Sequence, residues 1–454
     1  CIMCHYDGVL DPDTGNDVDM QEMIHKIHMG ENLPSVEAGN PYQIIGFRST
    51  VHDYSHVVFP QDLRNCTTCH ADEASQADNY KTEPTRTSCG SCHDDVVWET
   101  GENHVGGPQI SDMFCANCHF PEGELEFDAS VVGAHTIPSK SNQLDGINIE
   151  FLEVTNTAPG ANPTVRFTLL NDMGDALDPA DLDTFRLSYA GSTTDYSSVN
   201  RESAQAATAT GNTGEYTYTF AEPLPSDAEG SFTVSVEIRE RATLNAGTTT
   251  EVSLNESTYV NPTLAFAVTD SEAVPRRDIA DMDKCNNCHD LLSFHGGQRF
   301  SMEYCVMCHS PGADDSAVRP EEMLPAQSID MKFLIHRIHS GEELQWDYTI
   351  YGFRSSVHNY NEVVYPGNRA NCLGCHTDSS SYQVPSAGIL PTLATDNEYF
   401  SPIQPESSAC LSCHDSQEAA AHAFLNTAPF GESCGVCHGE GKEVSVDRVH
   451  AGND

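Results

Sequence analysis

All 18 cysteines of this chain fall in one five-residue pattern, Cys-x-x-Cys-His, which occurs nine times. Two thiols at this spacing can form thioethers with the vinyl groups of a haem, and the histidine that follows can coordinate the iron. The pattern therefore predicts nine c-type haems. The attachment residues are Cys1, Cys4, Cys66, Cys69, Cys89, Cys92, Cys115, Cys118, Cys285, Cys288, Cys305, Cys308, Cys372, Cys375, Cys410, Cys413, Cys434 and Cys437, and the proximal ligands are His5, His70, His93, His119, His289, His309, His376, His414 and His438.

Zinc sites, redox disulfides and structural disulfides also use paired cysteines, but they explain this set less well. A zinc site needs two such pairs that meet in space and does not require a histidine after the second cysteine. A thioredoxin-like motif would occur once, near a βαβ pattern. Because every cysteine lies inside a motif, none is left for a bridge at longer range.

Twelve histidines lie outside the motifs, which is enough to give every iron a second axial histidine. His56 is not expected to be a ligand, because Glu362 takes its place in the second half of the chain. Coordination by two histidines favours a low reduction potential of the haem iron and leaves no open position on it. The distal candidates are His25, His28, His52, His104, His135, His295, His336, His339, His358, His422 and His450.

The chain contains an internal duplication. Ile24-His-Lys-Ile-His28 recurs as Ile335-His-Arg-Ile-His339, and Gly46-Phe-Arg-Ser-Thr-Val-His52 recurs as Gly352-Phe-Arg-Ser-Ser-Val-His358. The motif at Cys285 has no counterpart in the sequence, so we expect ten haems in the parent protein, five in each half. The second half offers six distal candidates for five irons, and the sequence does not say which one is surplus. The matched position of His358 predicts that its replacement opens an iron.

Residues 140–276 contain neither cysteine nor histidine, and their pattern changes to period two. Thr213–Phe220 and Gly230–Ile238 alternate as half-buried strands do. We therefore predict a multidomain fold. Two mostly irregular or α-helical haem domains, residues 1–139 and 277–454, flank an antiparallel β-barrel or sandwich. Helices in the haem domains should be short, with the best candidate around Met20 to Met29.

The chain is strongly acidic: 22 basic residues face 68 acidic ones, for a formal charge of −46. This charge argues against nucleic acid and anionic lipid surfaces as partners. No stretch reaches the eighteen or so apolar residues of a membrane helix, and no signal peptide is present. Since covalent haem attachment takes place outside the cytoplasm, we expect that an export signal once preceded Cys1.

Two further groups of residues have candidate roles. Arg48 and Arg354, at matched positions, could pair with haem propionates. A run of four aspartates around a glycine has the alternating oxygen ligands of a calcium loop, with a solvated acidic turn as the competing interpretation. The second half shows no counterpart of that run. The four calcium candidates are Asp11, Asp13, Asp17 and Asp19.

With these motifs and the strand-rich insert, the chain resembles the OmcA/MtrC family of bacterial outer-membrane decahaem cytochromes. The resemblance implies two pentahaem domains around a Greek-key split barrel, bis-histidine haems in a branched chain, and a lipid-anchored protein on the surface of a Gram-negative bacterium. It also implies electron transfer from a porin-cytochrome conduit to metal oxides, chelated metal, flavins or other cytochromes. The sequence shows neither the family's anchor nor its extra cysteine pair, so it gives no basis for redox-controlled flavin binding.

Three functions compete at this point. The first is a non-enzymatic electron conduit, because closely spaced irons pass electrons without substrate chemistry. The second is a multihaem reductase of nitrogen or sulfur oxyanions, which would keep one iron open, often with lysine replacing a motif histidine. The third is a subunit of a cytochrome filament. All nine motifs here end in histidine, which favours the conduit.

Overall fold

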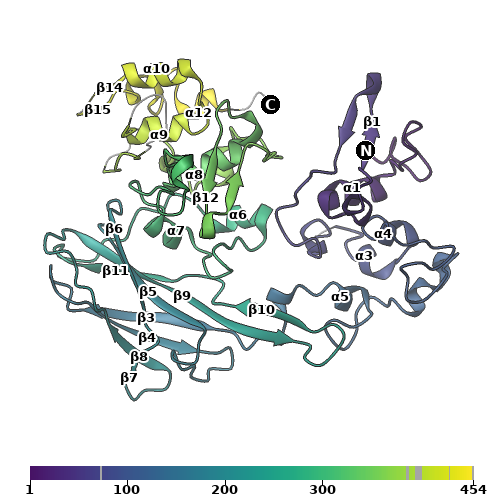
Figure 1. Cartoon of the computed structure of the whole chain (residues 1–454), viewed down its shortest axis with the longest axis horizontal. Helices are drawn as coiled ribbons and strands as arrows, with labels where there is room; N and C mark the ends of the chain where they lie inside the picture. The colour runs from purple at the N-terminus through teal and green to yellow at the C-terminus, as the bar shows by residue number, and fades with distance from the viewer. Residues whose placement is uncertain (72–73, 385–387, 394–400, 429, 452–454) are drawn as a thin grey trace. The chain divides into compact units, whose positions relative to one another are not determined.

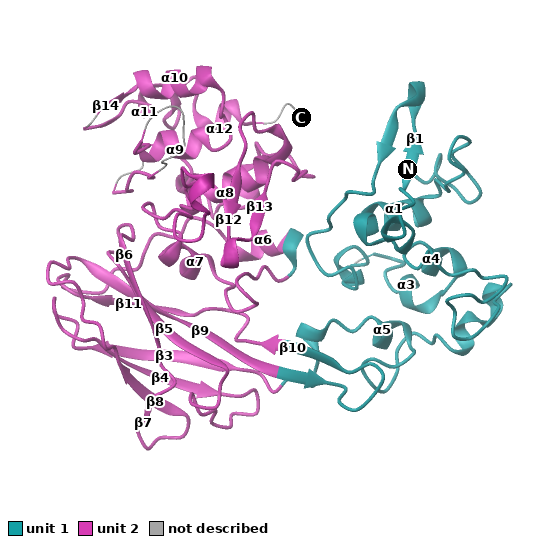
Figure 2. Ribbon diagram, viewed as in Figure 1, with its two compact units in different colours: residues 1–144, 242–254, 288–290 teal, residues 145–241, 255–287, 291–454 magenta. Residues whose placement is uncertain are grey.

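The computed structural model in Figure 1 describes residues 1–71, 74–384, 388–393, 401–428 and 430–451. The chain forms two compact units, which Figure 2 colours separately. Unit 1 comprises residues 1–144, 242–254 and 288–290, and unit 2 comprises residues 145–241, 255–287 and 291–454. No helix of the described residues is long and apolar enough to cross a membrane.

The strands between the haem motifs form two sheets with antiparallel pairing. One sheet has the order β10-β9-β5-β6, with β11 also paired to β9, and the other has the order β3-β4-β8-β7. Their bounds are β3 Asn148–Thr155, β4 Thr164–Leu170, β5 Thr184–Gly191, β6 Ser198–Ser203, β7 Thr208–Ala209, β8 Glu215–Thr219, β9 Ser231–Leu244, β10 Val252–Glu256 and β11 Thr263–Ala267.

The two sheets share one apolar core, to which β4 contributes Val165, Phe167 and Leu169 and β5 contributes Phe185 and Leu187. In β4 buried and partly exposed residues alternate, as the period-two pattern requires. Over the described residues the sheets do not close into a barrel. The expectation of an antiparallel β domain is confirmed, with two sheets around one core.

Strand β9 differs from the half-buried strand that its alternation predicted, because all eight residues from Ser231 to Ile238 are buried. One face points into the sandwich core through Phe232, Val234, Val236 and Ile238. The other face is covered by the haem-bearing segment that follows the sandwich. There the Tyr304 hydroxyl donates a 2.6 Å hydrogen bond to the Glu237 carboxylate. Polar residues in this strand therefore mark a contact between segments and not a solvent face.

The haem-bearing segments consist of short helices and two-stranded hairpins, as expected. Helix α1 coincides with the predicted helix and begins after Asp19, whose carboxylate accepts from the backbone of Gln21. In unit 1 the elements are α1 Met20–Met29, α2 Pro34–Glu37, α3 Asn79–Thr82, α4 Arg86–Gly90, α5 Val131–Ala134, β1 Gln43–Ile45 and β2 Val51–Asp53. Later in the chain they are α6 Met282–His289, α7 Met302–Cys308, α8 Met331–Ser340, α9 Pro405–Leu411, α10 Gln417–Leu425, α11 Gly435–His438, α12 Val446–Val449, β12 Thr349–Tyr351, β13 Val357–Asn359, β14 Thr427–Ala428 and β15 Gly431–Glu432.

The duplication is visible in the elements themselves. Helix α8 repeats α1: Asp330 caps it as Asp19 caps α1, and it ends at Gly341 with φ 43°, where α1 ends at Gly30 with φ 48°. Residues other than glycine rarely adopt a positive φ. A Cβ at Gly341 would also lie 2.0 Å from the carbonyl oxygen of Val363. The same capping and ending residues therefore fix the same ten-residue helix in both halves.

The sandwich core generates a prediction about stability. Phe185 is fully buried, and its ring centroid lies 5.3 Å from that of Phe167. Phe185→Ala should lower the local free energy of unfolding by about 3–5 kcal/mol, because it leaves a cavity between the sheets. Hydrogen–deuterium exchange of β4 and β9 peptides should therefore become faster. Met173→Ala, at a side chain that is 85% exposed, is the control. Equal exchange in both variants would contradict the shared core.

Candidate haem-binding sites

Seven motif histidines lie close to a histidine from outside the motifs, and the separations fall in a narrow range. The ring centroids are 6.0–6.3 Å apart in every pair. The pairs are His25–His70, His93–His135, His104–His119, His295–His309, His336–His376, His414–His450 and His422–His438. Each pair joins one predicted proximal ligand to one predicted distal ligand.

This separation fits a metal ion held between two imidazoles. A metal–imidazole bond is about 2 Å long, so two such bonds on opposite sides of an ion place the nitrogens about 4 Å apart. Each nitrogen lies about 1 Å from its ring centre, which brings the two centroids to roughly 6 Å. Ordinary aromatic contacts span about 4.5–7 Å. The tight clustering of seven pairs near one value therefore supports coordination over casual packing.

Three of the pairs occur twice, at matched positions of the duplication. His25–His70 corresponds to His336–His376, His93–His135 to His414–His450, and His104–His119 to His422–His438. The two halves differ in sequence around these residues. The repeated pairing is therefore a property of the duplicated fold.

Backbone carbonyls orient many of these rings. Nδ1 of His25 lies 2.7 Å from the carbonyl oxygen of Gln21, and Nδ1 of His135 lies 2.7 Å from that of Val131, each one helical turn earlier. A ring that donates from Nδ1 keeps its Nε2 free to bind a metal. Burial lowers the pKa of His336 to about 4, so this ring is neutral near pH 7, as a ligand must be.

Each motif folds as a single turn. The backbone N–H of His309 donates to the carbonyl of Cys305 at 2.9 Å. The same bond recurs in other motifs, for example from His70 to Cys66 at 2.9 Å. The turn brings two thiols and one imidazole to one side of the chain. Burial raises the pKa of Cys305 to about 12 and that of Cys92 to about 11. Redox-active thiols have lowered values, so these cysteines do not resemble a thioredoxin-type site, and all 18 are free of disulfides.

The distal candidates outside the seven pairs fall into two kinds. His28 and His339 have Nδ1 bound to the carbonyl one turn earlier, at 2.7 and 2.9 Å. Their rings pack edge-on against Phe59 and Tyr365. They share this Nδ1 orientation with His25, which belongs to a pair.

His52 and His358 are oriented differently. Nε2 of His358 lies 2.9 Å from Oγ of Ser356. A Cβ at Gly46 would lie 2.7 Å from Nε2 of His52, and one at Gly352 would lie 2.9 Å from Nε2 of His358. In both halves the Nε2 atom therefore faces the backbone of its own hairpin. His56 is exposed, and its expected lack of a ligand role stays a prediction.

The two arginines of the duplicated hairpins also match each other. Each guanidinium carbon lies 5.1 Å from the ring centroid of the preceding phenylalanine, Phe47 or Phe353. Arg48 has φ 58° and Arg354 has φ 56°, a strained conformation kept in both halves. The pairing of these arginines with propionates stays a prediction.

Three of the four aspartates of the suggested calcium loop, Asp11, Asp17 and Asp19, accept hydrogen bonds from backbone amides. Asp11 is buried and accepts from the amides of Asp13 and Ile45 at 3.0 and 2.8 Å, while Asp17 accepts from Asp19 at 2.7 Å. Over the part of the chain that the structure describes, no group of three or more histidine, cysteine or carboxylate side chains could hold a metal ion. The geometry therefore gives the calcium hypothesis no support.

The second half has no counterpart of the whole run, but it does contain a counterpart of Asp11. The Asp315 carboxylate accepts from the amide of Tyr351 at 2.9 Å, and Asp11 makes the same contact with the matched residue Ile45. Both aspartates hold the hairpin that carries the exposed phenylalanine and arginine. The sequence comparison missed the match because the residues that follow the two aspartates differ.

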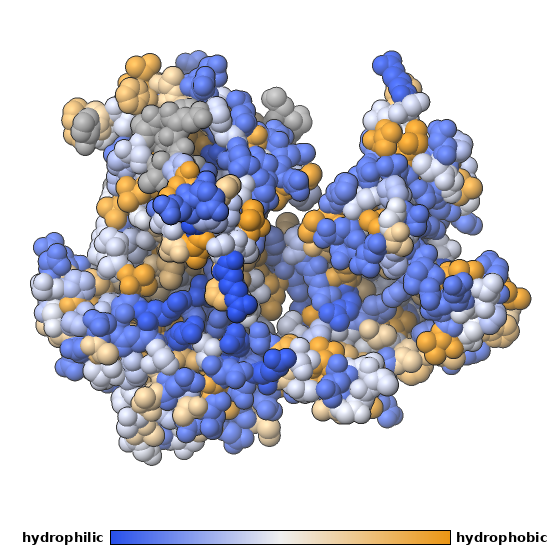
Figure 3. All heavy atoms as spheres, viewed as in Figure 1, coloured by the Kyte–Doolittle hydropathy of each residue, from blue (hydrophilic) through white to orange (hydrophobic). Residues whose placement is uncertain are grey.

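The surface around the motifs is rich in apolar side chains. Ile2 and Met3, inside the first motif, are 73% and 90% exposed, and Val436, inside the last, is 71% exposed. Figure 3 shows apolar residues scattered over the visible face of both units. Exposed apolar side chains at the attachment points are suited to contact with an apolar macrocycle.

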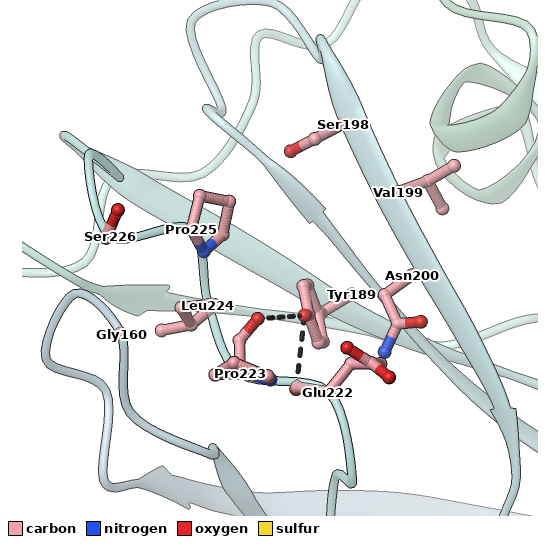
Figure 4. A pocket seen from close by; sticks show the side chains of 10 residues that line it. All are labelled: Gly160, Tyr189, Ser198, Val199, Asn200, Glu222, Pro223, Leu224, Pro225 and Ser226. Atoms are coloured by element: carbon pink, nitrogen blue, oxygen red, sulfur yellow. Dashed lines mark hydrogen bonds between the residues drawn. The ribbon is translucent and has the colours of Figure 1, made fainter.

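A pocket in the β sandwich has no connection with this chemistry. It is lined by Tyr189, Val199, Asn200, Glu222 and neighbouring residues of the Gly160 and Pro223–Ser226 turns (Figure 4). The Tyr189 hydroxyl donates to the carbonyl oxygen of Pro223 at 2.8 Å, which ties the loop to β5. The lining contains no histidine or cysteine.

Comparisons with known proteins identify a family and a fold. A family model described as outer membrane cytochrome MtrC/MtrF-like, domains II/IV, matches residues 1–132 and 277–451. The crystal structure of the outer membrane decaheme cytochrome OmcA is similar with a TM-score of 0.60 and 22% identity, over 99% of this chain and 70% of that chain. The crystal structure of MtrC from Shewanella baltica OS185 has a TM-score of 0.60 and 16% identity, over 96% and 69% of the two chains. No curated protein matches. At these identities the structures show a shared fold alone.

Proposed function

Because the chain belongs to the MtrC/MtrF-like family of outer membrane cytochromes, we propose that it conducts electrons through closely spaced bis-histidine haems to acceptors outside the cell. As a member of this family it is a multihaem c-type cytochrome of the cell surface. The observation that carries the conduit is the set of seven histidine pairs with centroids 6.0–6.3 Å apart. When bound, the haems supply the one-electron centres.

The assignment of ligands follows from the pairs and from ring orientation. The nine motifs would hold nine haems, each with its own proximal histidine. The distal ligands would include the seven paired histidines and, in the second half, His339, whose Nδ1 is held in the same way as that of its counterpart His28. His358 and its counterpart His52 would then be the surplus residues. This assignment reverses the expectation from sequence that replacing His358 opens an iron.

A closed set of ligands favours a conduit over an enzyme. Two histidines on each iron leave no position for an oxyanion substrate, and all nine motifs keep their histidine. Transfer would then depend on exposed haem edges and on surface charge. A porin-cytochrome conduit and other cytochromes would be the donors, and metal oxides, chelated metal and flavins the acceptors. The three domains would be residues 1–139, 140–276 and 277–454.

Substituting the two histidines of the second half that lie outside the seven pairs tests the ligand set. His339→Ala should open one iron and produce a high-spin signal in electron paramagnetic resonance of the oxidised protein. His358→Ala should leave the low-spin spectrum unchanged, since its Nε2 faces Ser356. A high-spin signal in the His358 variant, with none in the His339 variant, would reverse the assignment.

The acidic charge generates a prediction about salt. With a formal charge of −46, the reduced protein should be oxidised more slowly by hexaammineruthenium(III) as salt increases, because screening weakens attraction. Oxidation by ferricyanide should become faster, because screening weakens repulsion. Stopped-flow spectroscopy at several ionic strengths measures both signs. Oxidation rates that do not depend on salt would refute the prediction that surface charge controls them. Selective turnover of nitrite would favour a reductase.

A further inference from the structure

Three arginines converge on one buried carboxylate between the β sandwich and helix α7. Glu237 of β9 has a side chain that is 0% exposed. Its Oε1 lies 3.1 Å from Arg201 and 3.0 Å from Arg299, and its Oε2 lies 3.6 Å from Arg186. The Tyr304 hydroxyl donates to the same Oε1 at 2.6 Å. We call Arg186, Arg201 and Arg299 the arginine cluster.

The charges of this group do not balance. Three guanidinium groups, which are always protonated, face one carboxylate, and Glu237 is the acidic residue with which each of them forms its ion pair. Such an excess is unusual in a chain with 22 basic and 68 acidic residues. The side chains of Arg186 and Arg201 remain 43% and 40% exposed, so donors are left over for another partner. Two negative charges would neutralise the group.

The arginine cluster lies beside one particular haem motif. Tyr304 directly precedes Cys305, and Arg299 pairs through its backbone with Phe294, next to His295. His295 and His309 form the pair with the centroid distance of 6.0 Å.

A c-type haem carries two propionate groups, which match the two unbalanced positive charges. Guanidinium and carboxylate groups form strong, geometrically defined pairs. We propose that the haem held by Cys305, Cys308, His309 and His295 directs its propionates to the arginine cluster, and that the cluster raises the reduction potential of this haem. Positive charge nearby favours the reduced iron, which carries one positive charge fewer. The β sandwich would thereby tune one haem.

The proposal rests on the proposed function, because it needs a haem at this motif. Arg201→Gln should shift one one-electron step to lower potential, by about tenfold in its equilibrium constant, or about 59 mV. Glu237→Gln should shift the same step upward, because it removes a negative charge. Arg201→Lys should restore most of the potential. Potentiometric titration of the whole haem protein, followed by absorbance and electron paramagnetic resonance, measures these shifts.

Arg166→Gln is the matched control, since Arg166 also pairs with glutamates of the β sandwich, Glu153 and Glu215. It should leave every step unchanged. Opposite shifts in the Arg201 and Glu237 variants support the proposal, because general damage to the fold would not change sign. Unchanged potentials, or shifts of the same sign, in variants that keep nine low-spin haems would overturn it. Fewer than nine haems in the unsubstituted protein would instead overturn the proposed function.

Discussion

Axial coordination is the constraint on which the haem-bearing segments depend. Two imidazoles that share an ion must face each other across a fixed gap, and the observed 6.0–6.3 Å meets that requirement in seven pairs. Short helices suffice for this purpose: α1 places His25 and His28 three residues apart, so both lie on the same face of the helix. Unit 1 has few fully buried apolar residues, such as Leu33 and Tyr42. The macrocycles would supply the missing apolar contacts.

Much of this arrangement could be predicted because its signals are local. Each motif needs only five consecutive residues, and the helix predicted around Met20 to Met29 has the bounds of α1. The choice among distal histidines could not be predicted, because it depends on orientation in space. His339 and His358 are the same residue type at equally well matched positions, yet one has Nδ1 bound within its helix and the other turns Nε2 toward its hairpin.

The arginine cluster escaped prediction for a different reason. Its arginines come from β5, β6 and the segment before α7, and nothing in the sequence brings them together. The alternation around Glu237 reads as a solvent-facing side of a strand, whereas the structure covers that side. A charged residue in a strand that otherwise alternates small polar and apolar side chains was the only available signal. Glu237 indicated that its face of β9 is not an ordinary solvent face, but it did not indicate which segment covers that face.

Locating the irons tests the central claim most directly. Crystals of the haem-loaded protein, measured at the iron absorption edge, would give anomalous peaks at the metal positions. One peak should lie midway between the rings of each of the seven pairs, including His25–His70 and its duplicate His336–His376. Irons that lie beside the motifs but away from the paired rings, or that are coordinated by methionine or water on the second side, would contradict it.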